Sequence, residues 1–212
     1  MMTESMAYLL GCYLGDGCSY TRISDHGSSY QFSITSEDID LCNSCQDIVW
    51  SLFQKKSRVK PVIAESGNTH FQLIVCSKLI TTHFAAWTNK RLLIPKDVYE
   101  SKDLLVSFSR GLMDTDGWIC KTNPSDGYSR YRVGFKNTLP WVQEFRDILK
   151  SLDVKVGVLY PAKVKKHEKP AMAFTVNTNS YCSIVNFGIE RKRVLAAEYF
   201  QRMSHRGPKK NI

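Results

Sequence analysis

The sequence predicts an α+β protein with two pseudo-symmetric halves, each an α-β-β-α-β-β-α unit that forms one antiparallel four-stranded sheet. One segment occurs twice, 100 residues apart, as LLGCYLGDG at 9–17 and as SRGLMDTDG at 109–117. The strand-like segments that follow also correspond, at an offset of 101 residues, so that Phe32 and Ile34 match Val133 and Phe135. This repeat of a whole unit predicts two halves that pack through their first helices.

In the first half, the repeated segment is predicted to be a helix, and the residues after it alternate in polarity. Tyr30, Phe32 and Ile34 alternate with polar neighbours, a period-two pattern that indicates a half-buried strand. Ser36 is followed by two acidic residues and an apolar stripe at helical spacing, which predicts the start of a helix. In chain order we expect a hairpin over 18–23 and 29–35, a helix over 36–53, a hairpin over 57–63 and 69–76, and a helix over 78–87.

The second half repeats this order. We expect a hairpin over 118–122 and 129–136, a helix over 139–152, a hairpin over 154–160 and 172–177, and a short helix over 180–187. Pro140 falls in the first turn of its helix, where a missing N–H is tolerated. The predicted division is a first half over 1–90, a linker over 91–101, a second half over 102–189, and a basic C-terminal helix and tail over 190–212.

The composition is that of a folded protein with an excess of basic residues. Lys and Arg number 29 against 20 Asp and Glu, and the net charge of +9 favours a polyanionic partner but is equally compatible with an ordinary basic protein.

No apolar run is long enough to span a bilayer and no secretion leader is recognised, so we expect neither membrane association nor secretion. The seven cysteines lack disulfide-framework spacing, and Cys42 and Cys45 are expected to be core thiols rather than zinc ligands. None of the five histidines falls into a ligand or catalytic-triad pattern.

The two Asp-Gly pairs are the candidate chemical groups. Asp16 and Asp116 end the two predicted helices, where the helix dipole disfavours a negative charge. Gly11 and Gly111 occupy matching positions and are expected to let the two helices approach closely, and the glycine after each acid is expected to be a C-cap. Two carboxylates that face each other repel unless cations are present. A single Asp-Gly is usually a turn, but the duplication favours a divalent-metal site that hydrolyses phosphodiesters.

The open faces of the two sheets are the candidate binding surface. Helices on one side of each sheet leave the other side open, and two such sheets side by side form a long concave saddle. The polarity alternation places on it Gln31, Ser33 and Thr35 in the first half, and Arg130, Arg132 and Lys136 in the second. These residue types read base edges in the major groove, although alternating polar residues are also the ordinary solvent face of a sheet. The basic cluster on one strand and the duplicated acids together favour DNA.

Both repeated segments resemble the nine-residue motif of the LAGLIDADG homing endonucleases, and the order of elements is similar to that family's over essentially the whole chain. The second segment matches at Gly111, Leu112, Asp114, Asp116 and Gly117, and the first at Leu9, Gly11, Asp16 and Gly17. Leu14 replaces the family's usual Asp at the sixth motif position, which is a packing position. Two motifs in one chain resemble the monomeric members of the family.

The resemblance implies a site-specific endonuclease that cuts both strands of a long DNA target across the minor groove and leaves 3′ overhangs. Asp16 and Asp116 are the implied metal ligands, joined by the carbonyls of Gly15 and Thr115. The implied metal is Mg²⁺, with Mn²⁺ or Ca²⁺ able to occupy the same site. The residues implied to position water are Ser36, Lys136 and Asn137.

The implied partner is double-stranded DNA, bound by a monomer, with host intron RNA as a further partner in some relatives. The residues expected to contact DNA are Tyr20, Arg22, Gln31, Ser33, Thr35, Lys60, Gln72, Lys121, Arg130, Arg132, Lys136, Lys155, Lys163, Lys165 and Lys166. Because the first half offers mostly neutral open-face groups, we expect a non-palindromic target.

Two alternatives stay open on this fold: an RNA-binding intron maturase and a DNA-binding protein that does not cleave. In each case we expect the protein inside the cell with the host DNA, in a bacterial or phage-infected cytoplasm or an organelle matrix.

Overall fold

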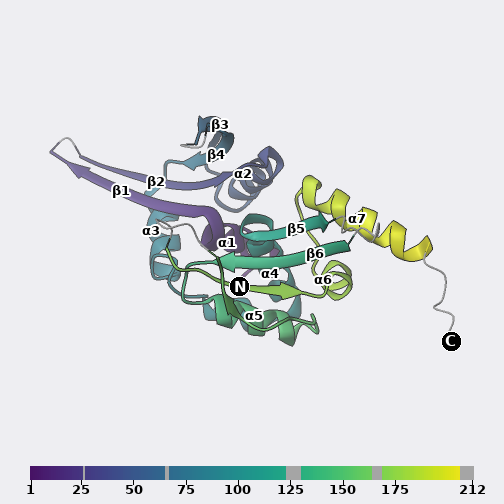
Figure 1. The fold of residues 1–212 in the computed structure, drawn as a ribbon. Helices are drawn as coiled ribbons and strands as arrows, with labels where there is room; N and C mark the ends of the chain where they lie inside the picture. The colour runs from purple at the N-terminus through teal and green to yellow at the C-terminus, as the bar shows by residue number, and fades with distance from the viewer. Residues whose placement is uncertain (26, 65–66, 123–129, 164–168, 206–212) are drawn as a thin grey trace, which may run out of the picture.

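Two helices that pack against each other join the two halves of the protein (Figure 1). α1 (Glu4–Asp16) leads the first half and α4 (Lys102–Thr115) leads the second. The computed structural model describes the chain except residues 26, 65–66, 123–129, 164–168 and 206–212. Each half has the order α-β-β-α-β-β-α, which confirms the predicted fold class.

The first half forms an antiparallel sheet with the strand order β1-β2-β4-β3. Its elements are β1 (Gly17–Ser24), β2 (Gly27–Ser36), α2 (Ile39–Phe53), β3 (Arg58–Ile63), β4 (Thr69–Val75) and α3 (Lys78–Trp87). A short 3₁₀ helix, η1 (Lys96–Glu100), leads into α4. The β1–β2 hairpin projects away from the body of the molecule, whereas α2 and α3 pack against the sheet (Figure 1).

The second half repeats this sheet with the strand order β5-β6-β8-β7. Its elements are β5 (Gly117–Thr122), β6 (Arg130–Asn137), α5 (Val142–Ser151), β7 (Tyr160–Pro161), β8 (Met172–Val176) and α6 (Thr178–Ile184). The C-terminal helix α7 (Glu190–His205) lies beside β5, at the opposite end of the molecule from the β1–β2 hairpin (Figure 1).

Three predicted elements of the second half are wrong in extent, and one of them, the short helix expected over 180–187, spans Thr178–Ile184. The helix expected from 139 begins at Val142, because Leu139 precedes Pro140 and is disfavoured from helical conformation. The strand expected over 154–160 is reduced to Tyr160–Pro161 and one isolated bridge, Val156 with Val176. Tyr160 pairs with Ala173, so three residues on one strand oppose two on the other, and this bulge breaks the ladder.

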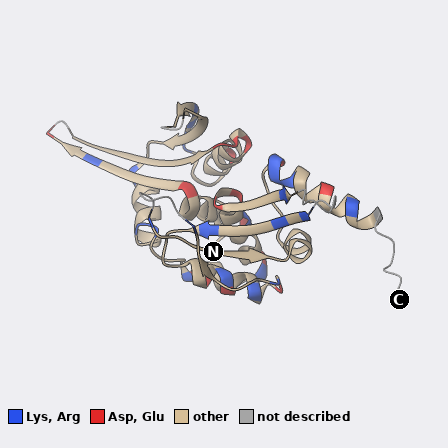
Figure 2. Ribbon diagram, viewed as in Figure 1, with Lys and Arg blue, Asp and Glu red and all other residues tan. Residues whose placement is uncertain are grey.

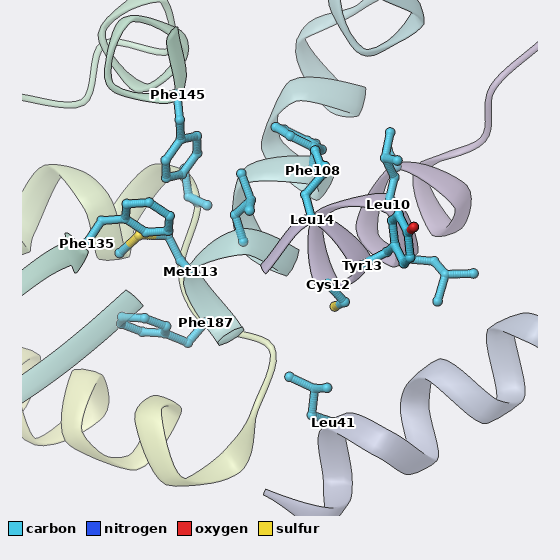
Figure 3. Packing of buried hydrophobic residues seen from close by; sticks show 14 of the residues in the cluster. Leu10, Cys12, Tyr13, Leu14, Leu41, Phe108, Met113, Phe135, Phe145 and Phe187 are labelled. Carbon is cyan, nitrogen blue, oxygen red and sulfur yellow. The ribbon is translucent and has the colours of Figure 1, made fainter. Parts of the chain in front are cut away.

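The hydrophobic core runs from one half into the other through the two central helices. Figure 3 shows Leu10 and Leu14 of α1 near Phe108 of α4, with Phe135 and Phe145 of the second half beyond them. All five side chains are fully buried. The two halves therefore share one core. Among the described residues, no helix is both long enough and apolar enough to cross a membrane.

The inward residues of each sheet are those that the alternation predicted. Phe32, Ile34, Val133 and Phe135 are fully buried. Their strand neighbours therefore point to the opposite, open face of each sheet. The two thiols of the Cys-x-x-Cys pair, Cys42 and Cys45, are likewise fully buried, in the core.

Candidate active site

The two acids meet because their helices touch at glycine. A Cβ atom added at Gly11 would overlap the Phe108 carbonyl oxygen, and one added at Gly111 would overlap the Tyr8 carbonyl oxygen. Only glycine allows this backbone separation, as the sequence predicts. A Cβ on Gly15 would lie 2.9 Å from Asp116 Oδ2, so the Asp116 carboxylate lies directly against the end of α1.

The expectation that the glycine after each acid is a helix C-cap is confirmed for Gly17 and wrong for Gly117. Gly17 caps α1 in an extended conformation with φ −81°, and the C-cap of α4 is Asp116 itself. A Cβ on either glycine would overlap the carbonyl oxygen four residues earlier, at Tyr13 or Met113. The glycines are therefore required for space at a sharp helix-to-strand turn.

Both acids have raised pKa values. Burial, and after it the charge of Asp16, together raise the pKa of Asp116 to about 7, although a hydrogen bond of 2.8 Å from Asn137 Nδ2 to Asp116 Oδ2 acts to lower it. Loss of solvation also raises the pKa of Asp16 to about 6, although the residue keeps an opening to solvent. The charges of Arg91 and Lys192 act to lower this pKa. A divalent cation bound between the two carboxylates would offset their mutual repulsion.

Two cations that sequence reasoning assigned to the linker and the tail complete the site. Arg91 donates to the Leu14 carbonyl from Nη2 (2.7 Å) and Nε (3.2 Å), and also to the Gly15 carbonyl. Lys192 is 3% exposed and donates from Nζ to the carbonyls of Met113, Asp114 and Gly117 at 2.8, 2.7 and 2.6 Å. Arg91 thus offsets the negative end of the α1 dipole, and Lys192 offsets that of α4; these two helices carry the repeated segments and are called the motif helices below.

Arg91 and Lys192 are separated by 101 residues, the offset of the repeat, so this spacing was the signal that could have revealed them. Trp141 Nε1 holds Arg91 by donating to its carbonyl at 2.9 Å. Lys192 is held because the neighbouring Arg191 makes two hydrogen bonds to Asp38, of 2.8 and 2.9 Å, which fix the start of α7 to the first half.

Replacing Lys192 with Met is expected to destabilise the protein by about 2–3 kcal/mol, because three buried carbonyls lose their donor together. Urea unfolding at neutral pH measures this change. Arg193→Met, at the exposed neighbouring position of α7, is the control and is expected to change stability by less than about 0.5 kcal/mol. Equal stability of the two variants would contradict a capping role for Lys192.

The sixth motif position has a packing role in both halves. Leu14 is fully buried, and Asp114 is 2% exposed. Asp114 accepts hydrogen bonds from the Tyr8 hydroxyl at 2.9 Å and from the Gly188 amide at 3.0 Å, and burial raises its pKa to about 6. This carboxylate therefore ties α4 to α1 and to the segment before α7.

The donor set of the site fits a hard divalent cation such as Mg²⁺. Within the described part of the chain, no group of three or more His, Cys, Asp or Glu side chains is arranged to hold a metal. Mg²⁺ is usually held by one or two carboxylates, with waters and phosphate oxygens as its other ligands, so Asp16 and Asp116 suffice. Arg91 already donates to the Gly15 carbonyl, and this contact competes with the implied metal role of that oxygen.

The strand register brings most of the expected DNA-contacting residues to the two open faces. On the first sheet, Tyr20 and Arg22 of β1 pair with Gln31 and Ser29 of β2. Gln72 of β4 lies between Thr35 of β2 and Lys60 of β3 and pairs with both. On the second sheet, Arg130, Arg132 and Lys136 lie on the face opposite the buried Val133 and Phe135. Figure 2 shows basic residues on β1 and along β6.

The first sheet is more basic than expected, which corrects the contrast drawn between the halves. Arg58, which the sequence analysis missed, pairs with Ile74 and shares the open face with Arg22 and Lys60. All three are exposed. Arg58 is the first residue of β3 and lies two positions before Lys60, so the alternation that selected Lys60 could also have identified Arg58.

Several other expected contacts are placed differently. Ser33 is on the open face but only 3% exposed, between Cys18 and Ile74 on the neighbouring strands. Lys121 lies on the opposite face, where its Nζ is 3.0 Å from Glu198 Oε2 of α7. Lys155 and Lys163 are exposed outside the strands, and Lys165 and Lys166 lie outside the described residues.

The expected water-positioning residues lie at the ends of β2 and β6. Gly17 pairs with Ile34 and Gly117 with Phe135, so Thr35 and Lys136 are the next residues along β2 and β6, and Asp16 and Thr35 line the same cavity. Asn137 contacts Asp116 directly, as described above. Ser36 is 6% exposed, and its hydroxyl accepts a hydrogen bond from the Asp38 amide at 3.1 Å.

The fold is shared with several solved structures, although no protein-family model matches the chain. I-DmoI in complex with its target DNA in the presence of Mn has 19% identity and a TM-score of 0.61, covering 86% of this chain and 93% of that one. The LAGLIDADG meganuclease I-AabMI bound to uncleaved DNA has 10% identity and a TM-score of 0.57, covering 96% and 92%. DUF199/WhiA from Thermatoga maritima has 14% identity and a TM-score of 0.62, covering 99% and 62%.

In sequence, 120 residues of the chain are 24% identical to a DNA polymerase of Acanthamoeba polyphaga mimivirus. The match covers 55% of this chain and 7% of the polymerase, so the chain corresponds to a small part of that relative. The structural neighbours define the class of protein: over nearly its whole length the chain has the LAGLIDADG fold, in the form that carries both motifs in one chain.

Proposed function

We propose that this protein is a site-specific homing endonuclease, which makes a metal-dependent staggered double-strand break in a long, non-palindromic DNA target. The observation that carries the proposal is the pair of acids at the touching ends of α1 and α4, both with raised pKa values. Such a pair is unfavourable for the free protein and suited to divalent cations.

The surface around the acids supports a two-stranded polyanion as the substrate. Basic and amide side chains line both open faces, including Arg22 and Lys60 in the first half and Arg132 and Lys136 in the second. Lys and Arg contacts to phosphates supply the affinity, and side chains on the strands read base edges. The compartment we propose is the one that holds the target DNA.

In this proposal each acid and its surroundings act on one strand. A bound Mg²⁺ supplies charge for activating water and for stabilising the leaving oxygen in an in-line displacement. Asn137 holds Asp116 in place, and Lys136 lies one step along the sheet, where an ammonium favours a bound phosphate. Arg91 and Lys192 fix the carbonyls at both helix ends, so the two acids keep their separation when the metal is absent.

One observation favours a second candidate, a DNA-binding protein that does not cleave. Arg91 donates to the Gly15 carbonyl, an implied metal ligand, and so partly supplies the positive charge that a metal would bring. The similarity to WhiA, which is not named as an endonuclease, is consistent with such a function.

The test is binding selection followed by cleavage. Duplexes with random sequence are selected for binding in Ca²⁺, cloned into a plasmid, and then incubated with the protein and Mg²⁺. We expect linear product with staggered ends, and none when EDTA is added. Tight and sequence-specific binding without cleavage in Mg²⁺ or Mn²⁺ would instead establish the non-cleaving candidate.

A further inference from the structure

The two half-sites are chemically different although their backbones repeat. Thr35 and Lys136 occupy corresponding positions, each one residue past the strand partner of the glycine that follows the acid, so a hydroxyl in one half replaces an ammonium in the other. Asn137 donates to Asp116, but its counterpart Ser36 bonds the Asp38 amide instead. The first half therefore lacks the two side chains that lie beside the acid of the second half.

The first half has a His–Glu pair in their place. The last β2–β4 pair is Ser36 with Phe71, so the next step places Glu37 opposite His70 on the open face. The distance from His70 Nε2 to Glu37 Oε1 is 3.9 Å, and the two side chains are 25% and 62% exposed. The corresponding residues 101 positions later are Thr138 and Ala171, so the second half has no imidazole here.

This pair and Asp16 open into the same cavity. Its volume is about 430 Å³, and its lining includes Asp16, Thr35, Glu37 and His70. A cavity of this size accommodates several water molecules, each of which occupies roughly 30 Å³. Asp38, which also lines it, is already paired with Arg191, so His70 is the imidazole that shares this cavity with Asp16.

We propose that His70, which lies beside Glu37, is the water-positioning residue for the strand that is cut at Asp16, so that the two strands are hydrolysed by different side chains. This inference rests on the proposed nuclease function. The imidazole accepts a hydrogen bond from the attacking water and directs its oxygen toward phosphorus. The new P–O bond forms as one phosphodiester P–O bond breaks, the water releases its proton to solvent, and the leaving oxygen takes a proton from solvent.

The test follows the two strands separately. A selected target is labelled at one 5′ end or the other and cut under single-turnover conditions with Mg²⁺. His70→Ala is expected to slow cleavage of one strand by roughly 10–100-fold and of the other by less than about 3-fold, so that nicked duplex accumulates. His70→Gln keeps a hydrogen-bonding side chain and is expected to restore part of the rate. Thr138→Ala, at the position in the second half that matches Glu37, is the control and is expected to keep the parent ratio of the two rates.

The outcomes separate the two levels of the proposal. Equal slowing of both strands in His70→Ala, or an unchanged ratio, would overturn the role of His70 and leave the endonuclease assignment intact. If the parent protein binds its target but cuts neither strand, the proposed function fails, and the role of His70 fails with it. Melting temperatures and gel-shift affinities of the variants identify a loss caused by misfolding or lost binding, which would slow both strands.

Discussion

Asp16→Asn and Asp116→Asn are each expected to reduce double-strand cleavage by at least about 10²–10³-fold, the effect of removing one preorganised charge-stabilising group from an active site. Asn keeps the size of the side chain but removes the negative charge that would hold a metal. Binding of the target is expected to persist, because the basic open-face residues that would contact phosphates are unchanged. Single-turnover cleavage and gel-shift titration measure the two properties.

The matched control is Asp47→Asn, which changes an exposed acid on α2 that does not line the cavity beside Asp16, and we expect parent rates. Normal cleavage by both active-site variants would show that these acids are not the metal ligands.

Asp116→Asn is also expected to stabilise the metal-free protein. The folded-state pKa of Asp116, raised to about 7, lies above its ordinary value of 3.8, so the folded state binds more protons than the unfolded state between these limits. Stability therefore falls as the pH rises through that window. At pH 7.5, Asp116→Asn should be more stable by about 1–2 kcal/mol, a figure reduced because solvent reaches the pair.

The pH dependence provides an internal check on this gain. Near pH 4 both acids are protonated in the folded state, so the difference between Asp116→Asn and the parent protein should shrink toward zero. Thermal melts in EDTA at both pH values measure it. A variant less stable than the parent at pH 7.5 would mean that the pair is already compensated by Arg91 and Lys192.

Gly111→Ala is expected to be the most destabilising of the substitutions considered, at about 3 kcal/mol or more. The new methyl group would overlap the Tyr8 carbonyl oxygen and lie 3.0 Å from the Cys12 amide, and these are backbone atoms that cannot rotate away. The better helix propensity of Ala, about 1 kcal/mol, does not compensate. The melting temperature should fall by roughly 6–12 °C for a chain of this size.

Cleavage should fall with stability in this variant, because separating α1 and α4 also separates the two acids. Ser5→Ala is the control, since it adds no volume and lies on the exposed part of α1, and we expect a change within about 0.5 kcal/mol. Wild-type stability of Gly111→Ala would mean that the helices do not pack as closely as the structure indicates.

Local patterns predicted the parts of the fold that depend on local chemistry. The alternation around Phe32 and Val133 identified the central strands and their buried faces, because a strand exposes successive side chains on opposite sides. Prediction failed where one residue disturbs the pattern. Pro140 moved the start of α5 to Val142. The extra residue before Tyr160 interrupted a strand that the composition of residues 154–160 favours.

The candidate site divides in the same way. Asp16 and Asp116 were found because a charge at a helix C-terminus is unusual locally and occurs twice. Lys121 was expected to face DNA, but a strand alone does not reveal that α7 covers its face and that Glu198 neutralises it.

By itself, the sequence determined that two acid-ended helices repeat, that each precedes a four-stranded sheet, and that basic side chains lie on the open faces. Polarity alternation and helix-end chemistry act between near neighbours and are therefore visible in one dimension. Only the tertiary structure decided that Arg91 and Lys192 cap the motif helices and that His70 shares a cavity with Asp16. These contacts join residues more than 50 positions apart, and the packing of α1 against α4 and of α7 against the first half fixes them.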